Sequence, residues 1–304
     1  MSRKFLFTTF LITLGLVILA CVAFGGTWLW SRLRLQPLEK EDMIFQGIRY
    51  SRQVLQNPRP LVVHIVKIDL RAPGISFLVT PGDPKSELPL EARTTSQFLD
   101  EFGLQLAVNG DGFSPWASNG PLDYYPHAGD PVAPLGAAAS KGVIYAQDSH
   151  GHPSLYISPT NQARFNTSPG KIYNVISGGQ MLVERGQSTL AGSKADDTGS
   201  EGADSASPQP RTAIGLDKRM RTLIIVVVDG RQPSYSEGVT LAELADLMVA
   251  SGAHNAMNLD GGGSSTLVME GSLGQARVLN SPIDQQIPGR QRYVGNHLGI
   301  FARP

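Results

Sequence analysis

The sequence predicts an α+β fold: a strand-rich mixed-sheet domain with a few helices, preceded by one N-terminal transmembrane helix. Three observations favour this fold class. Short apolar runs rich in Val and Ile alternate with turns, in a chain of 304 residues that includes 33 Gly and 21 Pro. Two segments carry the capping-box signal of a helix N-terminus. The first thirty residues hold an apolar run of membrane-spanning length.

The overall composition narrows the function classes. The 26 Lys and Arg residues balance the 26 Asp and Glu residues, so nothing global favours a nucleic acid as partner. Cys21 is the only cysteine, so the sequence holds neither a disulfide framework nor a thiolate metal site. The chain is long enough to bury a sizeable core in one or two domains.

The N-terminal stretch from Phe5 to Trp30 contains no charged residue and is long enough to cross a bilayer as a helix. Basic residues flank it on both sides, and tryptophans stand near its end. We predict a cytoplasmic tip and signal anchor in residues 1–34 and a linker in residues 35–46. The protein is then a single-pass membrane protein with its catalytic domain outside the cytoplasm. A cleaved signal peptide and lipidation at Cys21 are the alternatives.

Residues 47–304 are predicted to form one domain. Its first strands are expected at 61–70 and 75–80, on either side of a Pro-Gly turn. His64 lies inside the first of these strands and is interpreted as a packing residue of the sheet. Residues 188–210 consist largely of Gly, Ser, Ala, Asp and Pro, so we expect a mobile insertion there.

A short helix is expected at 94–102, because Thr94 and Gln97 form a capping box. The strand at 104–108 follows and ends in the run Asn109-Gly110-Asp111-Gly112. This run fits a tight turn, for which Asn-Gly is a strong signal, and it also fits a polar site at a strand end. A calcium loop is a third interpretation, although the remaining ligands of that pattern are missing.

The stretch from Gly238 to Gly271 carries the most specific pattern. Thr240 and Glu243 form a second capping box for an amphipathic helix that Gly252 ends. A short strand then leads into Asp260, three glycines and two serines. Consecutive glycines are costly in any regular element, so they indicate a backbone that another group must approach closely. The plainer alternative is a set of tight turns capped by the Asp260 side chain.

Four motifs occur in a fixed order: RTAIG from Arg211, an apolar strand ending in Asp229-Gly230, GVTLAELADLM from Gly238, and NLDGGGSSTLV from Asn258. In this order they resemble the phosphodiester glycosidase family, over roughly residues 60–303. The resemblance implies a strand-rich α/β domain and cleavage of a sugar from a sugar-phosphate diester.

The resemblance also implies the site residues. Asp260, Asp229 and Arg211 are expected to be catalytic, and no residue is assigned to a metal. The expected substrate-binding residues are Asn109, Gly110, Ser177, Gly178, Gly179, Gly261, Gly262, Gly263, Ser264 and Ser265. One departure is Asp111, which stands where many relatives have no carboxylate. A carboxylate there repels a phosphate unless it binds a metal or turns away, so the substrate preference stays open.

These residues suggest a chemistry. Arg211 suits bidentate phosphate binding, and the backbone of Gly261 to Gly263 suits an anion cradle. Asp260 and Asp229 are then the nucleophile or base and the stabiliser of an oxocarbenium-like transition state. The roles of the two carboxylates stay open at this point.

We therefore expect hydrolysis of the glycosidic bond in a sugar-1-phosphodiester of an envelope or exopolysaccharide glycoconjugate. The expected partners are this diester or polysaccharide and, through residues 5–30, the membrane, with no nucleic acid. No cofactor is expected to be required, while a divalent cation stays an open alternative. The competing functions are a non-catalytic polysaccharide-binding or assembly protein and a metal-dependent phosphodiesterase.

Overall fold

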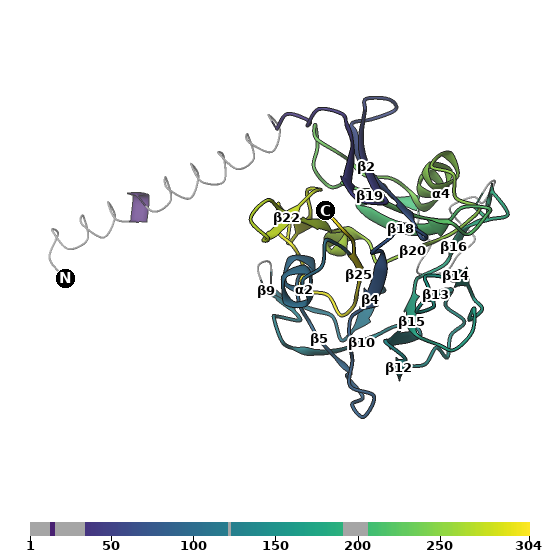
Figure 1. Ribbon diagram of the computed structural model, residues 1–304. Coiled ribbons are helices and arrows are strands. Elements are labelled where there is room, and N and C mark those ends of the chain that lie inside the picture. The colour runs from purple at the N-terminus through teal and green to yellow at the C-terminus, as the bar shows by residue number, and fades with distance from the viewer. Residues whose placement is uncertain (1–12, 16–33, 121–122, 191–205) are drawn as a thin grey trace, which may run out of the picture.

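The computed structural model describes residues 13–15, 34–120, 123–190 and 206–304. These residues form a strand-rich domain with few helices (Figure 1), which confirms that part of the α+β prediction. In the described part of the chain, no helix combines the length and the apolar character needed to cross a bilayer. The predicted membrane span at residues 5–30 lies outside the described residues, apart from 13–15.

The largest sheet has eight strands, whose neighbours pair antiparallel. In spatial order it contains β1 (Lys40–Phe45), β2 (Ile48–Leu55), β3 (Leu61–Asp69), β19 (Thr222–Val228), β18 (Arg211–Leu216), β20 (Asn255–Asn258), β16 (Met181–Glu184) and β17 (Gln187–Ser188). β1 falls inside the segment predicted as a linker, so the sheet begins before residue 47. This edge strand is largely exposed, and its sequence KEDMIF is therefore too polar to stand out as a strand.

Two five-stranded sheets complete the main architecture. One contains β22 (Ala276–Val278), β21 (Leu267–Glu270), β6 (Leu106–Asn109), β25 (His297–Phe301) and β4 (Ser76–Val79). The other contains β12 (Val143–Ala146), β11 (Ala138–Ser140), β15 (Asn174–Ser177), β13 (Ser154–Ile157) and β14 (Ala163–Phe165). The smaller pairings join β5 (Leu90–Glu91), β10 (Pro131–Pro134) and β7 (Phe113–Ser114), then β8 (Ala117–Gly120) with β9 (Asp123–Tyr125), and β23 (Ile283–Asp284) with β24 (Ile287–Pro288).

Both predicted helices form with their predicted caps. In α2 (Thr95–Phe102) the Thr94 side chain accepts from the N–H of Gln97, whose side chain accepts from Thr94 in return. In α4 (Leu241–Ala250) Thr240 and Glu243 make the same reciprocal pair. Each cap satisfies two of the free N–H groups at a helix start, which is why this local signal fixes the helix start so well.

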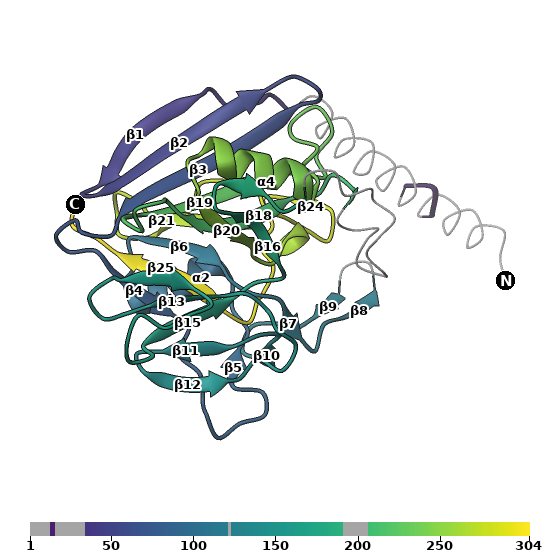
Figure 2. The same ribbon diagram turned by 90° about the vertical axis from the view of Figure 1, so that its right-hand side faces the viewer.

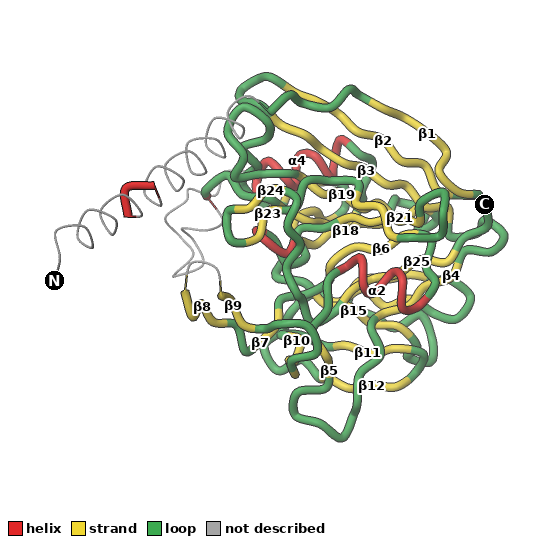
Figure 3. The backbone as a smooth tube through the Cα atoms, turned by 90° about the vertical axis from the view of Figure 1, so that its left-hand side faces the viewer, coloured by secondary structure: helices red, strands yellow, loops and turns green. Residues whose placement is uncertain are grey.

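The sheets and helices stack in layers, because each buries its apolar face against a neighbour. The main core packs one face of the eight-stranded sheet against the two five-stranded sheets, while α4 covers the other face (Figure 2). α2 covers the outer side of the sheet that contains β6 and β25 (Figure 3). β19 shows the arrangement most clearly, since alternate residues enter the two cores, as expected of a strand buried on both faces.

The connection from Leu259 to Thr266 crosses between two sheets. It leaves the eight-stranded sheet at the end of β20 and enters the second sheet at β21, and it contains the short 3₁₀ helix η1 (Gly262–Ser264). The crossing places the glycine run at an edge where strand ends of both sheets meet. Of the predicted insertion, residues 191–205 lie outside the described part of the chain, while Ser188 belongs to β17 and Gln209 pairs with Val239.

Candidate active site

Asn109, at the end of β6, holds the crossing loop in place. Its side chain is fully buried and uses both ends of the amide. Nδ2 donates to the carbonyl of Asp260 over 2.8 Å, and Oδ1 accepts from Thr212 Oγ1 at 2.9 Å and from the N–H of Thr266 at 3.1 Å. The N–H of Asp260 donates to the Gly110 carbonyl at 2.9 Å. The predicted Asn109-Gly110 pair therefore does meet the Asp260 loop, and Asn109 is placed to position it.

Guanidinium groups come close to two of the three glycines. A Cβ atom on Gly262 would lie 3.0 Å from Nη2 of Arg231, whereas one on Gly261 would lie 3.0 Å from the carbonyl oxygen of Pro210 and 3.8 Å from Nη1 of Arg211. A Cβ atom on Gly263 would lie 2.5 Å from Nη2 of Arg292 and 2.7 Å from Oδ1 of Asp284, closer than a Cβ atom approaches other heavy atoms in proteins. The close approach that the glycine run indicated is therefore made by two guanidinium groups and by the backbone of Pro210.

Arg211 is mostly engaged by backbone. Its exposure is 6%, and it donates from Nε to the carbonyl of Val239 and from Nη2 to that of Ser207, both over 3.3 Å. It lies beside the loop as predicted, but much of its fork is occupied. Arg292 is paired with Asp284 at 2.8 Å and reaches Ser264 Oγ over 3.4 Å.

Arg231 and Arg292 were not among the predicted site residues. Arg231 directly follows Asp229-Gly230, and Arg292 lies in an irregular loop far along the chain. Arg231 carries one usable signal, since an arginine after a strand-end Asp-Gly is a candidate anion ligand. Arg292 carries none, because nothing in the spacing relates it to Gly263.

Asp260 is partly exposed, as are Gly261 and Gly262 after it. Its backbone is fixed at both ends, by Asn109 and by Gly110. Gly262 adopts a φ of +58°, and its N–H donates to the carbonyl of Pro210 at 2.8 Å. Within the described residues the N–H groups of Gly261 and Gly263 donate to no acceptor, and the buried hydroxyl of Ser265 has no hydrogen-bond partner. The loop therefore presents donors beside a carboxylate.

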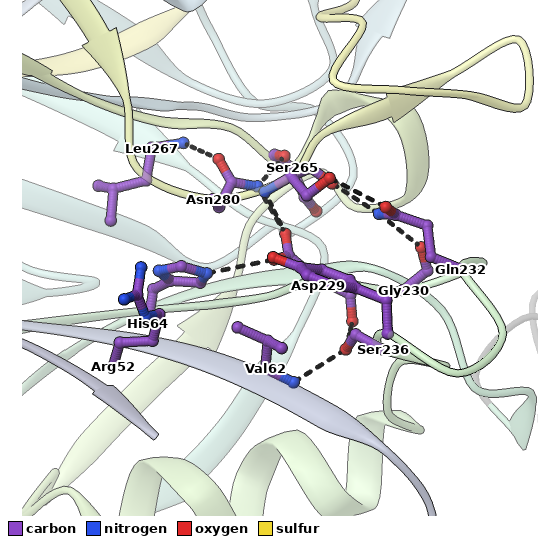
Figure 4. A network of polar contacts seen from close by, with 12 residues as sticks. Arg52, Val62, His64, Asp229, Gly230, Gln232, Ser236, Ser265, Leu267 and Asn280 are labelled. Carbon is purple, nitrogen blue, oxygen red and sulfur yellow. Dashed lines mark hydrogen bonds and ion pairs between the residues drawn. The ribbon is translucent and has the colours of Figure 1, made fainter. Parts of the chain in front are cut away.

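The other predicted catalytic carboxylate, Asp229, lies in a buried network (Figure 4). It is fully buried, and its Oδ1 accepts from the N–H of Ser281 at 2.7 Å and from Asn280 Nδ2 at 3.0 Å. Its Oδ2 lies 3.2 Å from Nε2 of His64 and 3.3 Å from the Tyr235 hydroxyl. This saturated environment suits a structural role, and it separates Asp229 from the open side of the loop.

The Asp229 network supports the site indirectly. Asn280 donates to Asp229 and also to the carbonyl of Ser265, each over 3.0 Å, while its Oδ1 accepts from the N–H of Leu267. Burial, reinforced by the charge of Asp229, raises the pKa of Tyr235, so its hydroxyl stays a donor. The C-terminal end of the glycine loop is therefore tied to the core through Asn280.

The predicted Ser177-Gly178-Gly179 turn begins at the end of β15 and contacts Asn258, the last residue of β20, two positions before Asp260. The N–H of Gly179 donates to the carbonyl of Asn258 at 3.1 Å, and a Cβ atom on Gly178 would lie 2.1 Å from that oxygen. Ser177 is fully buried and donates to the carbonyl of Ala137 over 2.6 Å. The two glycines are thus required because a side chain at either position would clash with Asn258. The Ser177 hydroxyl already has a partner inside the protein, the carbonyl of Ala137.

Asp111 is a second carboxylate beside the loop. It is 2% exposed, and its oxygens accept from the N–H groups of Gly112 at 2.7 Å and Gly136 at 2.8 Å. Burial and, to a smaller extent, the charge of Asp260 raise its pKa to about 6, although these two hydrogen bonds act to lower it. The described residues contain no group of three or more His, Cys, Asp or Glu side chains able to hold a metal. Asp111 is therefore turned into the protein, where its oxygens are held by backbone N–H groups.

The phosphodiester glycosidase family matches residues 102–301, which is more than half of the chain. This chain belongs to that family. Among curated relatives, the N-acetylglucosamine-1-phosphodiester alpha-N-acetylglucosaminidase of Homo sapiens is 33% identical over 99 residues, or 33% of this chain and 18% of that protein. The protein of the same name from Bos taurus is 41% identical over 63 residues, or 21% of this chain and 11% of that protein.

Solved structures share the fold of this phosphodiester glycosidase domain. The catalytic domain of the zebrafish N-acetylglucosamine-1-phosphodiester alpha-N-acetylglucosaminidase, auto-inhibited by its pro-peptide, matches with a TM-score of 0.60 at 23% identity, over 88% of this chain and 85% of that one. A hypothetical protein from Synechocystis matches with a TM-score of 0.67 at 17% identity, over 88% and 64% of the two chains.

Proposed function

We propose that this chain hydrolyses the glycosidic bond of a sugar-1-phosphodiester, with Asp260 as the catalytic carboxylate. The observation that carries the proposal is the glycine loop itself. Asp260 leads directly into three glycines. The guanidinium groups of Arg231 and Arg292 lie against Gly262 and Gly263, and that of Arg211 lies 3.8 Å from the Cβ position of Gly261. A carboxylate beside clustered cations suits a substrate that develops positive charge at one atom and holds negative charge at the next.

The reaction breaks the bond between the anomeric carbon and the phosphate oxygen. Water supplies a hydroxyl group to the anomeric carbon and a proton to the departing phosphate, so the products are a free sugar and a phosphomonoester. Asp260 acts on the anomeric carbon directly or through the attacking water, and stabilises the oxocarbenium-like transition state. The guanidinium groups and the N–H groups of Gly261 and Gly263 stabilise the phosphate as it leaves.

N-acetylglucosamine is the first sugar to test, because it stands in the names of the human and bovine relatives. We further propose that residues 5–30 anchor the chain in a membrane and that the substrate is an envelope or exopolysaccharide glycoconjugate outside the cytoplasm. The uncharged stretch with flanking basic residues supports the anchor. Protease protection of the full chain in sealed vesicles tests its orientation.

The decisive experiment uses methyl N-acetylglucosamine-1-phosphodiester in ¹⁸O-labelled water. Glycosidic cleavage places the label on the sugar, whereas cleavage of the P–O bond places it on phosphate. We expect label on free N-acetylglucosamine, unaffected by a chelator, and none from Asp260→Asn. Label on phosphate that disappears with the chelator would instead identify a metal-dependent phosphodiesterase. Saccharide binding without any product would identify a binding protein.

A further inference from the structure

A cavity of about 780 Å³ opens beside the second five-stranded sheet and plays no part in the chemistry described above. Residues of β11, β12, β13 and β15 line it together with the loops that join these strands, and Gly179 to Met181 form another part of its wall. Cavities of this size accommodate a ligand the size of one or a few sugar rings.

Two sets of contacts connect residues of the cavity wall with the glycine loop. Gln180 in its wall accepts from the N–H of Asn258 at 3.1 Å and donates to Asn258 Oδ1 at 2.8 Å. Asn258 lies two residues before Asp260, a span of at most about 7 Å along the chain. On the other side, His152 lies against Gly136, whose N–H binds Asp111 beside the loop.

The charges of the cavity differ from those of the glycine loop. Among the described residues that line it there is no Lys and no Arg, and the one carboxylate, Asp148, is paired with His152 at 2.8 Å. The rest of the wall combines small apolar side chains with the amides of Gln147, Asn166 and Gln180. A phosphate finds no cation there, whereas a neutral sugar finds apolar surface and hydroxyl partners.

Two polar groups are available for sugar hydroxyls. Within the described residues the side-chain amide of Gln180 makes no hydrogen bond, although its backbone does. Asp148 accepts from His152 Nδ1, which orients the ring and leaves Nε2 as its second hydrogen-bonding atom. Fixed polar groups on an apolar wall are the usual means by which a site orients a ligand.

We propose that this cavity is the subsite for the sugar, and that the arginine side of the glycine loop receives the phosphate and the group attached to it. The inference rests on the proposed function, since it divides one phosphodiester between two faces of the same loop. The glycosidic bond then lies across Asp260, between the neutral cavity and the guanidinium groups.

The test measures binding separately from turnover, by calorimetry on the full chain. N-acetylglucosamine, glucose, galactose and mannose are the neutral probes, and N-acetylglucosamine-1-phosphate is the charged probe. Ala146→Phe fills the cavity from β12, and Val143→Phe places the same side chain at an exposed position of that strand. Gln180→Ala removes one hydroxyl partner, with exposed Gln187→Ala as its control. Thermal unfolding checks that every variant folds.

We expect Ala146→Phe to weaken the binding of the preferred neutral sugar at least about 10-fold, and Gln180→Ala about 3- to 10-fold. Neither control should change it. Arg292→Gln should weaken the sugar phosphate and spare the neutral sugar. Unchanged neutral-sugar binding in folded Ala146→Phe, equal losses of both probes in Arg292→Gln, or no neutral-sugar binding by the wild-type chain would each overturn the subsite. Absence of hydrolysis with Ala146-sensitive sugar binding intact would refute only the proposed function.

Discussion

Asp229 and Asp260 have the same sequence signature, an aspartate that ends a buried apolar strand and precedes glycine. The structure gives them opposite surroundings. Asp229 is fully buried and has four partners around its carboxylate, whereas Asp260 is partly exposed on a loop that crosses between two sheets. A buried carboxylate whose oxygens are engaged inside the protein has little capacity left for a substrate, so exposure to solvent separates a structural aspartate from a candidate catalytic one.

The largest expected effect is on turnover in Asp260→Asn. Removing the charge while keeping the shape should lower kcat by about 10²- to 10⁴-fold, as for other catalytic carboxylates. The melting temperature should stay close to the wild-type value, because the carboxylate is not part of the core. Release of free sugar and thermal unfolding measure the two quantities. A variant that retains a tenth of the wild-type rate would contradict the assignment.

Asp229→Asn should show the reverse pattern. In the variant, an amide NH₂ group replaces one carboxylate oxygen and faces hydrogen-bond donors such as the Ser281 N–H, which it cannot accept from. We therefore expect a loss of about 2–5 kcal/mol in the free energy of unfolding. The remaining folded fraction should turn over within about 10-fold of the wild-type rate. Denaturant unfolding measures the loss, and exposed Asp246→Asn is the control, expected to change stability by less than about 0.5 kcal/mol. Inactive but fully stable Asp229→Asn would restore this residue to the catalytic set.

Substitutions of Arg292 test whether the loop that carries Asp260 binds the phosphate of the substrate. Arg292→Gln should raise KM for the phosphodiester about 10- to 100-fold with a smaller change in kcat, because phosphate is bound in the ground state and the transition state alike. Arg292→Lys should recover part of the loss, since the charge returns without the planar fork. Exposed Arg277→Gln on β22 is the matched control. Equal KM values for Arg292→Gln and Arg277→Gln would remove Arg292 from the site.

The smallest expected effect is the pH dependence contributed by Asp111. Its pKa is about 6 in the folded chain, above the ordinary value of 3.8. Between these values the folded state holds a proton that the unfolded state has lost, so stability falls as pH rises through 6. Relative to Asp111→Asn, the wild-type chain should lose on the order of 1–3 kcal/mol of unfolding free energy between pH 4 and pH 7.

Denaturant unfolding of both proteins across this pH range measures the difference. Burial lowers the pKa of His297 to about 3, so this residue destabilises the fold as pH falls below about 6.5. The same contribution is present in both proteins and cancels. A difference that is flat with pH would show that Asp111 titrates normally.

The sequence by itself determined the local elements. Both capping boxes, the doubly buried strand at 222–228 and the strand-to-loop transition at Asp260 follow from contacts within a few residues or from side-chain periodicity. The resemblance to the family also predicted that Asn109, Ser177, Arg211 and Asp229 converge on Asp260, and Asn109 does contact it. Local signals succeed for the helix caps and strands because the interactions that they report are themselves local, whereas the contact of Asn109 with Asp260 was inferred from the resemblance.

Only the tertiary structure decided which charged groups meet at the loop. Arg292 lies against Gly263 although 29 positions separate them along the chain. Asn280 and Ser281, which belong to a loop distant in sequence, donate hydrogen bonds to the carboxylate of Asp229. Burial and partner geometry depend on how the sheets stack, which residue type and spacing do not report. The sequence therefore supplied the aspartates, and the stacking of the sheets assigned one to the core and one to the candidate site.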